Sequence, residues 1–455
     1  MLKRRIYAIV EVKERELLSK ILLGVKMANK GYSFVIGKKN SLFNFSKYQR
    51  PGIFFFKGMG RKNIKPMQEL KKFGHKIVGF DEEGMVMNMV ETIPIRVTHK
   101  CLDLVEYFFT VGKKQSNNTL KIYPKLKKKI CEIGNSRFDL LKKNCRGIYY
   151  NEVKEIKKEY GKFVFFPSKF TIINNFNFKG ISKSTKQGPG RFVLEEDLKD
   201  QKKIEKKLLS FFNFFPKKYP NIKIIIKPHP IEDKNYWRSL LKKIKCKNLI
   251  LVDNTYQTNS YILAAEFNVG SNCHTSLESF LLNKPTINIR ACKSDGYVIS
   301  ELIRSVSGKE VLKVKELEKI IVDWFKKGKE FKNNLTSKNL KILNYNFENV
   351  KKESYYYFEK NIKKIKILNE NNNDQFSNTF FFNIFEFIRK LKNIYYRLKS
   401  HRIKQTYREM KFPGLTIEEF ESYTSKICNV LKIKYKDILV REIYPGCYCI
   451  EKHSK

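Results

Sequence analysis

Short apolar runs separated by helical segments recur through residues 5–330, and this alternation limits the fold more than any other feature of the chain. The first run is Ile6–Val10, and Glu14–Lys30 follows it as a helix with acidic residues in its first turn and Gly31 at its end. Strands that are buried on both faces give continuous apolar runs, and helical connections between them make the sheet parallel. The sequence therefore predicts an α/β protein with doubly wound, Rossmann-like sheets.

The strand signals fall into two series, which indicates two such domains. The first series ends near a lysine-rich helix around Glu152–Tyr160, and the second begins with Phe163–Phe166. At 455 residues the chain is also too long for one ordinary core. We therefore expect an N-terminal domain over residues 1–160, a second domain over residues 161–368, and a linker with a basic helical tail over residues 369–455.

The tail has the pattern of an amphipathic helix. After an asparagine-rich stretch at 369–375, apolar residues in Phe381–Leu398 recur at steps of three and four, with lysines and arginines between them. Two interpretations stay open. The helix lies on an anionic membrane surface, or it packs its apolar side on the rest of the protein.

The net charge of +47 comes from 92 lysine and arginine residues against 45 acidic ones. Only 17 of the 92 are arginine, the side chain whose planar fork reads phosphates and bases. The lysines run through nearly every segment, which favours a composition bias with a solvated surface. Attraction to an anionic membrane or substrate is the second interpretation, and nucleic-acid binding is the third. We expect no nucleic-acid partner.

The cysteines and the N-terminus indicate the compartment. Nine cysteines are scattered from Cys101 to Cys449, and the first apolar run is too short for a signal peptide. No segment has the roughly 20 apolar residues that a membrane-spanning helix needs. We therefore expect a cytoplasmic protein, with peripheral attachment to the inner face of the plasma membrane as an option.

An apolar strand that ends in a histidine is the most informative string. The run Ile224–Pro230 reads IIIKPHP. Ligands of open parallel sheets bind beyond the carboxyl ends of the strands, so His229 stands where a ligand would lie. The flanking prolines restrict the backbone on both sides. His229 and Lys227 are therefore expected to hold a ligand phosphate, although a histidine that only caps the strand is the alternative.

A second phosphate site is indicated where the strand Phe267–Val269 runs into a helix. Thr275 and Glu278 have the spacing of a capping box, in which both side chains bind amide groups of the first turn. A helix N-terminus with amides and hydroxyl groups is also an anion site. We therefore expect ligand binding by Ser271, Thr275, Ser276 and Glu278 in addition to capping.

Three acidic residues, Asp81, Glu82 and Glu83, precede Gly84 at the end of the strand Lys76–Phe80. Such a run is usually a solvated turn. At a cleft it supplies a general base, because mutual repulsion raises a carboxylate pKa. The sequence has no Asp-x-Asp triplet, no Gly-x-x-x-x-Gly-Lys loop and no His-Glu-x-x-His. We therefore expect a mechanism with no metal and no cofactor.

Taken together, these strings resemble bacterial surface-carbohydrate biosynthesis proteins with a GT-B fold. The resemblance covers roughly residues 5–330, and its strings are IVEVKEREL at 9–17, DEEG at 81–84, GNSRFD at 134–139, KPHP at 227–230 and TSLE at 275–278 before NKP at 283–285. More distantly, the chain resembles bacterial sialyltransferases and Kdo transferases. The resemblance implies two Rossmann-like domains that face a cleft.

The resemblance also implies residue roles. Glu82, in an acid-acid-glycine motif with Glu83, would be the base on the acceptor hydroxyl. His229 with Pro230 would contact the donor phosphate, and the hydroxyl pair at 275–276 would bind it.

The implied function is a metal-independent glycosyltransferase. It would move a sugar from a nucleotide donor, with CMP as the expected nucleotide, to a carbohydrate or lipid-linked glycan acceptor of a surface polysaccharide, lipopolysaccharide or capsule. The His-Pro and hydroxyl strings also resemble transferases that move glycerol phosphate or ribitol phosphate from a CDP donor, where the attacked atom is phosphorus. A basic nucleic-acid-binding or scaffold protein is the non-enzymatic alternative.

Overall fold

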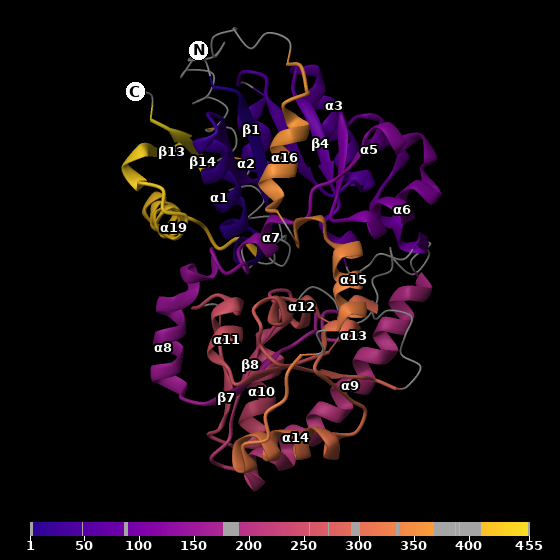
Figure 1. The fold of residues 1–455 in the computed structure, drawn as a ribbon, viewed down its shortest axis with the longest axis vertical. Coiled ribbons are helices and arrows are strands. Elements are labelled where there is room, and N and C mark those ends of the chain that lie inside the picture. Colours follow the sequence, from indigo (N-terminus) through magenta and orange to yellow (C-terminus); the bar gives the residue numbers. More distant parts are fainter. Residues whose placement is uncertain are drawn as a thin grey trace. The chain divides into compact units, whose positions relative to one another are not determined.

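The computed structural model has two compact units, each built around one sheet (Figure 1). Unit 1 consists of Met1–Glu82, Arg96–Leu140 and Lys351–Lys455, and unit 2 consists of Glu83–Ile95 and Leu141–Val350. The residues that the structure describes are 3–47, 49–85, 90–175, 191–253, 255–271, 273–292, 301–333, 336–350, 352–367, 387, 391 and 411–453.

Unit 1 has an eight-stranded sheet with the order β13-β14-β2-β1-β3-β4-β5-β6. The six strands from β2 to β6 in this order pair in parallel, and β13 and β14 pair antiparallel. The strands are β1 (Arg5–Val10), β2 (Ser33–Lys38), β3 (Ile53–Lys57), β4 (Lys76–Phe80), β5 (Tyr107–Thr110), β6 (Ile130–Glu132), β13 (Ile438–Tyr444) and β14 (Cys447–Lys452). The helices are α1 (Lys13–Asn29), α2 (Lys39–Ser46), α3 (Ile64–Lys72), α5 (His99–Asp103), α6 (Lys113–Ile122), α7 (Ser136–Asp139), α16 (Ser354–Ile362) and α19 (Ile417–Val430), while α4 (Ile93–Arg96) joins the two units.

Unit 2 has a six-stranded parallel sheet with the order β12-β11-β10-β7-β8-β9. The strands are β7 (Phe163–Pro167), β8 (Lys223–Lys227), β9 (Leu249–Leu251), β10 (Phe267–Gly270), β11 (Thr286–Ile289) and β12 (Lys309–Val311). The helices are α8 (Tyr150–Tyr160), α9 (Arg191–Lys218), α10 (Lys234–Ile244), α11 (Thr258–Ala264), α12 (His274–Leu281), α13 (Glu301–Val306), α14 (Val314–Lys327) and α15 (Ser337–Asn346). The predicted α/β class with two Rossmann-like sheets is confirmed.

The limits of the two units differ from the predicted boundaries at 160/161 and 368/369. Helix α8 belongs to unit 2, because Glu152 accepts hydrogen bonds from the amide of Gln257 (3.0 Å) and the hydroxyl of Ser260 (2.6 Å). Helix α16 returns to unit 1, where the ring of Phe358 packs on Phe55 with centroids 5.0 Å apart. These contacts join residues far apart in sequence, so chain order alone places both helices in the wrong unit.

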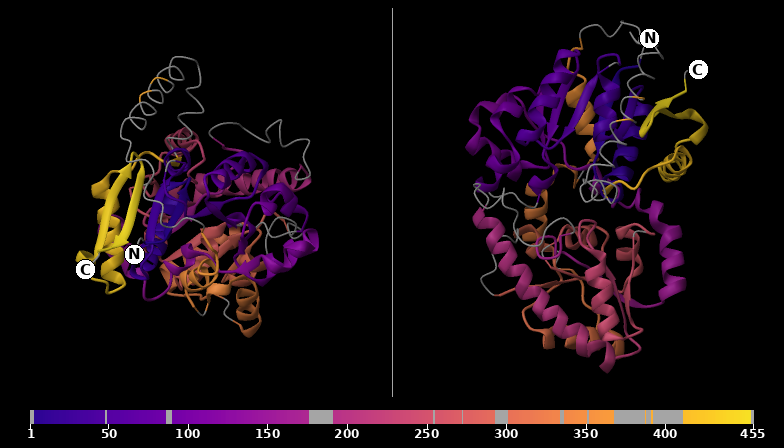
Figure 2. Two further views of the ribbon diagram at one scale, coloured as in Figure 1. Left: turned by 90° about the horizontal axis from the view of Figure 1, so that it is seen from above. Right: turned by 180° about the vertical axis from the view of Figure 1, so that it is seen from behind.

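The C-terminal region is more than a helical tail. Its described part, residues 411–453, contains α19 and then the hairpin of β13 and β14, and β14 pairs with β2 (Figure 2). The hairpin covers the edge of the parallel sheet, where unpaired amide and carbonyl groups would otherwise stand open. The predicted amphipathic helix at 381–398 lies outside the described residues, apart from Phe387 and Leu391. In the described part of the chain, no helix has the length and apolar character to cross a membrane.

Candidate functional site

The strand order of unit 2 marks one edge of its sheet as a ligand site. The chain starts at β7, adds β8 and β9 on one side, and then adds β10, β11 and β12 on the other. The order therefore reverses between β7 and β10, and open α/β sheets bind ligands beyond the carboxyl ends of the strands at such a point. Ser168 follows β7, His229 lies shortly after β8, and helix α12 follows β10. The predicted residues His229, Ser271, Thr275 and Ser276 thus follow the ends of β8 and β10, the two strands that pair with β7.

Helix α12 begins one residue before Thr275. Its N-cap is Cys273, which makes no side-chain capping hydrogen bond, and His274 is its first residue. The predicted capping box of Thr275 and Glu278 is therefore wrong, because Thr275 is already inside the first turn and is not at the N-cap. Its hydroxyl is not used for capping.

Two hydroxyl groups of this first turn have no hydrogen-bond partner in the described part of the chain. The Thr275 Oγ1 and Ser276 Oγ atoms are both buried and accept or donate no hydrogen bond among the described residues. Ser276 is packed against the end of β10, since a Cβ added to Gly270 would lie 2.5 Å from Ser276 Oγ. Glycine at 270 is thus needed for the helix to approach the strand this closely. A buried hydroxyl without a partner costs about 1–3 kcal/mol, so native structures normally satisfy it with water or a ligand.

His229 is held by its own turn and by the loop after β7. Its amide donates to Ser168 Oγ (3.3 Å), and its Nδ1 accepts from the amide of Ile231 (3.3 Å). An imidazole nitrogen that accepts carries no proton, so the neutral ring has its proton on Nε2. The turn therefore presents His229 as an Nε2–H donor.

The ammonium group of Lys227, predicted to contact a phosphate, is held by backbone carbonyl groups in this structure. Its ammonium group is buried and donates to the carbonyl oxygens of Asp253 (2.7 Å) and Tyr256 (3.2 Å), and it lies 5.5 Å from the ring centroid of Tyr261. These three partners belong to the segment that follows β9. Lys227 thus fixes that segment, because its donors are directed at backbone carbonyls there.

The remaining predicted residues of unit 2 lie near the same edge. Ser271 directly follows β10 and is buried, and Glu278 is buried within α12. Pro230 is half-buried beside His229. Two residues that the sequence patterns did not single out also belong here, Ser168 and Glu232, and both contact the His229 turn. A polar residue directly after the buried strand Phe163–Pro167 was the only available signal for Ser168.

In unit 1, Glu82 is a buried ion-pair partner. Its carboxylate lies 3.1 Å from the ammonium group of Lys20 and 3.4 Å from that of Lys57. Lys57 also pairs with the buried Glu16, whose carboxylate accepts from the amide of Glu11 (2.8 Å). Oppositely charged groups therefore fill the carboxyl ends of β1, β3 and β4. The side chain of Glu83 lies outside the described residues.

The charges around Glu82 contradict the reason for which it was expected to act as a base. Burial raises the pKa of Glu82, but the charges of Lys20, Lys57 and Arg137 outweigh it and hold this pKa below its usual range. An efficient general base has a pKa near the operating pH. Repulsion between neighbouring acids does not determine the pKa of Glu82, because the charges of three cations from distant parts of the sequence lower it.

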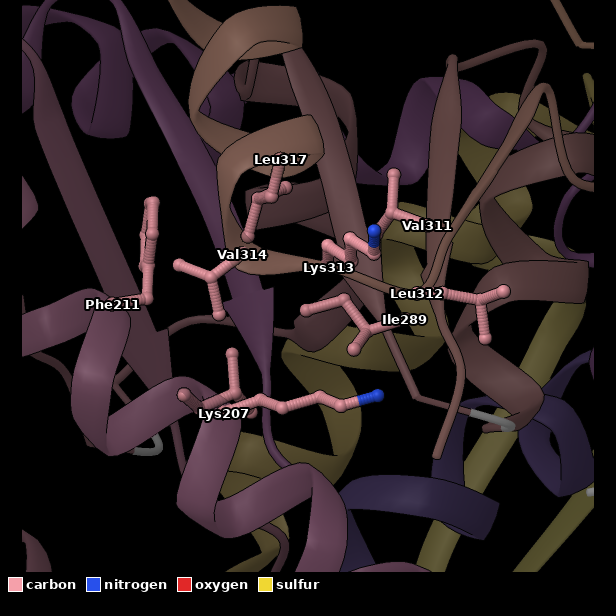
Figure 3. A pocket seen from close by; sticks show the side chains of 9 residues that line it. Lys207, Phe211, Ile289, Val311, Leu312, Lys313, Val314 and Leu317 are labelled. Carbon is pink, nitrogen blue, oxygen red and sulfur yellow. The ribbon is translucent and has the colours of Figure 1, made fainter. Parts of the chain in front are cut away.

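A small cavity in unit 2 is not a ligand site. It has a volume of about 10 Å³ and lies among α9, β11, β12 and α14 (Figure 3). Its lining is mainly apolar, with Phe211, Ile289 and Leu317 as examples. This space holds about one water molecule. Among the described residues, no group of histidine, cysteine, aspartate and glutamate side chains is arranged to hold a metal ion.

The ion pairs of Glu82 predict a pH dependence of stability. Its folded-state pKa lies below the unfolded value of about 4.3, so its stabilising contribution is present above that pH and is lost as the pH falls towards the folded-state pKa. Glu82→Gln should lower the free energy of unfolding at pH 7 by about 3–5 kcal/mol, because buried cations lose their partner. The variant should also lose less stability than the wild type between pH 6 and pH 3, measured by urea unfolding.

Glu106→Gln is the matched control, since Glu106 forms a half-exposed ion pair with Lys76. Its cost should stay within about 1 kcal/mol. Equal costs for the two variants would contradict the role of the buried cluster.

Known proteins resemble this chain in fold only. No protein-family model and no curated protein sequence matches it. A UDP-GlcNAc 2-epimerase from Neisseria meningitidis, solved with UDP-GlcNAc bound, aligns at 12% identity with a TM-score of 0.50 and covers 80% of this chain and 100% of its own. A UDP-GlcNAc 2-epimerase from Methanocaldococcus jannaschii in complex with UDP-GlcNAc and UDP aligns at 14% identity with a TM-score of 0.45. The alignment covers 76% of this chain and 100% of the epimerase. Alr3699/HepE from Anabaena in complex with UDP and glucose aligns at 9% identity with a TM-score of 0.43. The alignment covers 80% of this chain and 100% of HepE. The chain thus has the two-domain, GT-B-like Rossmann architecture of the Neisseria structure.

Proposed function

We propose that this chain is a nucleotide-sugar-processing enzyme and that unit 2 binds the phosphate groups of the nucleotide at the start of α12. The observation that carries the proposal is a pair of buried hydroxyl groups, Thr275 Oγ1 and Ser276 Oγ, that have no hydrogen-bond partner among the described residues. They stand at the strand-order reversal, where a Rossmann sheet binds its ligand.

The chemistry of the site suits a phosphate. Phosphate oxygens accept hydrogen bonds from hydroxyl groups and from the amide groups of a first helical turn, and the helix dipole favours their negative charge. His229, held as an Nε2–H donor, would supply a further hydrogen bond from the end of β8, which β7 separates from β10. Such donors also stabilise the negative charge that grows on a departing nucleotide.

The nucleotide that we propose to test first is UDP. The Neisseria structure that shares the architecture holds UDP-GlcNAc, which supports a UDP sugar as the ligand class. The sequence motifs predict CMP, and the alternative reaction on a CDP polyol stays a hypothesis. CMP-, CDP- and GDP-linked compounds therefore belong in the same panel.

Two reactions are candidates. The motif resemblance favours glycosyl transfer to a surface-carbohydrate acceptor, and the name of the Neisseria neighbour favours epimerisation of the sugar at carbon 2. Glycosyl transfer with Glu82 as the general base is the less favoured mechanism, because the cations around Glu82 hold its pKa low. Both reactions require the phosphate of the nucleotide to be held, so nucleotide binding is tested before the reaction.

Removing the Ser276 hydroxyl should have opposite effects on the stability of the protein and on its affinity for UDP. Ser276→Ala removes a buried hydroxyl that has no partner within the described ranges, so the ligand-free protein should keep or raise its melting temperature. The same change should weaken UDP binding by about tenfold or more, the loss of one hydrogen bond to a charged group. Thermal shift and calorimetric titration measure both effects.

Ser279→Ala is the matched control on the same helix, because the Ser279 hydroxyl already donates to the carbonyl of Thr275 (2.7 Å). This variant should leave UDP affinity unchanged. The proposal fails if the wild type binds no nucleotide in the panel, or if the two variants bind UDP equally well.

The products distinguish the two reactions. Incubation with UDP-GlcNAc and no acceptor should give the carbon-2 epimer, seen by proton NMR, if the chain is an epimerase. A transferase leaves the sugar unchanged until an acceptor is added. In either case, His229→Ala should lower turnover by about a hundredfold, as expected for the loss of a strong transition-state contact. Near-normal turnover of this variant would remove His229 from the mechanism.

A further inference from the structure

A buried carboxylate stands behind the His229 turn. Glu232 has no exposed surface, and its amide donates to the carbonyl of His229 (2.9 Å). Its side chain therefore belongs to the same turn as the histidine.

The carboxylate of Glu232 joins three segments of unit 2. Its Oε1 accepts from the amide of Phe170 (2.7 Å), and its Oε2 accepts from the Ser168 hydroxyl (2.7 Å) and from the indole Nε1 of Trp237 (2.8 Å). Ser168 and Phe170 lie in the loop after β7, and Trp237 lies in α10. One side chain thus ties the loop after β7, the His229 turn and a covering helix together.

The Ser168 hydroxyl connects the Glu232 carboxylate to the backbone of His229 through two hydrogen bonds. Because its proton is donated to Glu232, its oxygen is left to accept, and it accepts from the His229 amide (3.3 Å). The Ser168 amide also donates to the carbonyl of Lys227 (2.9 Å). The backbone on both sides of Pro228 is therefore fastened to the loop after β7.

Burying a carboxylate at this position is unfavourable for the stability of the fold. In the described part of the chain no lysine or arginine forms an ion pair with Glu232, and burial raises its pKa while its hydrogen bonds oppose that shift. A buried charge without a cation is a poor source of stability. Its three donors, by contrast, all need an acceptor, and two of them are fixed N–H groups that an apolar residue would leave unsatisfied.

We propose that Glu232 is a positioning residue for the nucleotide site, acting through Ser168 to fix the backbone of His229 and the Nε2–H form of its ring. This inference rests on the proposed function for its consequence in binding. The state of the His229 ring is independent of that function.

Nitrogen-15 NMR of the histidine rings tests the proposal on the full chain, with the His229 signals assigned by their loss in His229→Ala. The wild type should show neutral His229 as the Nε2–H form. Ser168→Ala keeps the Glu232 carboxylate but removes the hydroxyl that connects it to the His229 amide. Glu232→Gln replaces one carboxylate oxygen by an amide nitrogen, which cannot accept a hydrogen bond. Both variants should show a mixture of ring forms and should bind UDP about tenfold more weakly, with circular dichroism unchanged.

Glu266→Gln is the matched control. Glu266 accepts from the indole Nε1 of Trp324 (3.3 Å) and precedes β10, at the opposite edge of the same sheet. It should leave the His229 signals and UDP affinity unchanged. If Glu232→Gln does not fold, Ser168→Ala alone decides the result.

A folded Ser168→Ala protein with wild-type His229 signals would overturn the proposal. If the wild type binds no nucleotide, the proposed function fails, and the ring signals of the variants still decide whether Glu232 positions His229.

Discussion

The parallel pairing of β7 with β8 on one side and β10 on the other is the constraint on which the candidate site depends. It brings together three strand ends that are up to about a hundred residues apart in the chain. Ser168, His229 and the first turn of α12 stand at these ends because parallel strands finish at one edge of their sheet. The packed apolar residues on both faces of this sheet therefore determine where the polar groups meet.

The corresponding edges of the two units differ in how their polar groups are satisfied. In unit 1, Glu82 is paired with Lys20 and Lys57. In unit 2, the Thr275 and Ser276 hydroxyls are buried without a partner among the described residues. One oxygen of Glu82, Oε2, also has no hydrogen-bond partner among the described residues, but the charges of Lys20 and Lys57 compensate this carboxylate within the fold. The two neutral hydroxyls have no such compensation, and a ligand that supplies acceptors stabilises them further. This difference favours unit 2 as the nucleotide-binding unit.

The sequence predicted most strands of the two parallel sheets because these are short apolar runs, but it missed β12, which reads KEV. It predicted the location of His229 because a strand end precedes it. It did not predict the start of α12, since the capping spacing of Thr275 and Glu278 fits a helix that begins two residues later. The ion pairs of Glu82 and the hydrogen bonds of Glu232 were beyond the sequence patterns, because their partners come from distant segments. The β13–β14 hairpin was missed because its pairing with β2 spans almost the whole chain.

The central claim is that the first turn of α12 binds a nucleotide phosphate. A crystal structure of the chain with UDP tests it most directly. We predict that a phosphate oxygen lies within hydrogen-bonding distance, about 2.5–3.2 Å, of Thr275 Oγ1 or Ser276 Oγ. A nucleotide bound at another place, with both hydroxyl groups still without partners, would contradict the claim.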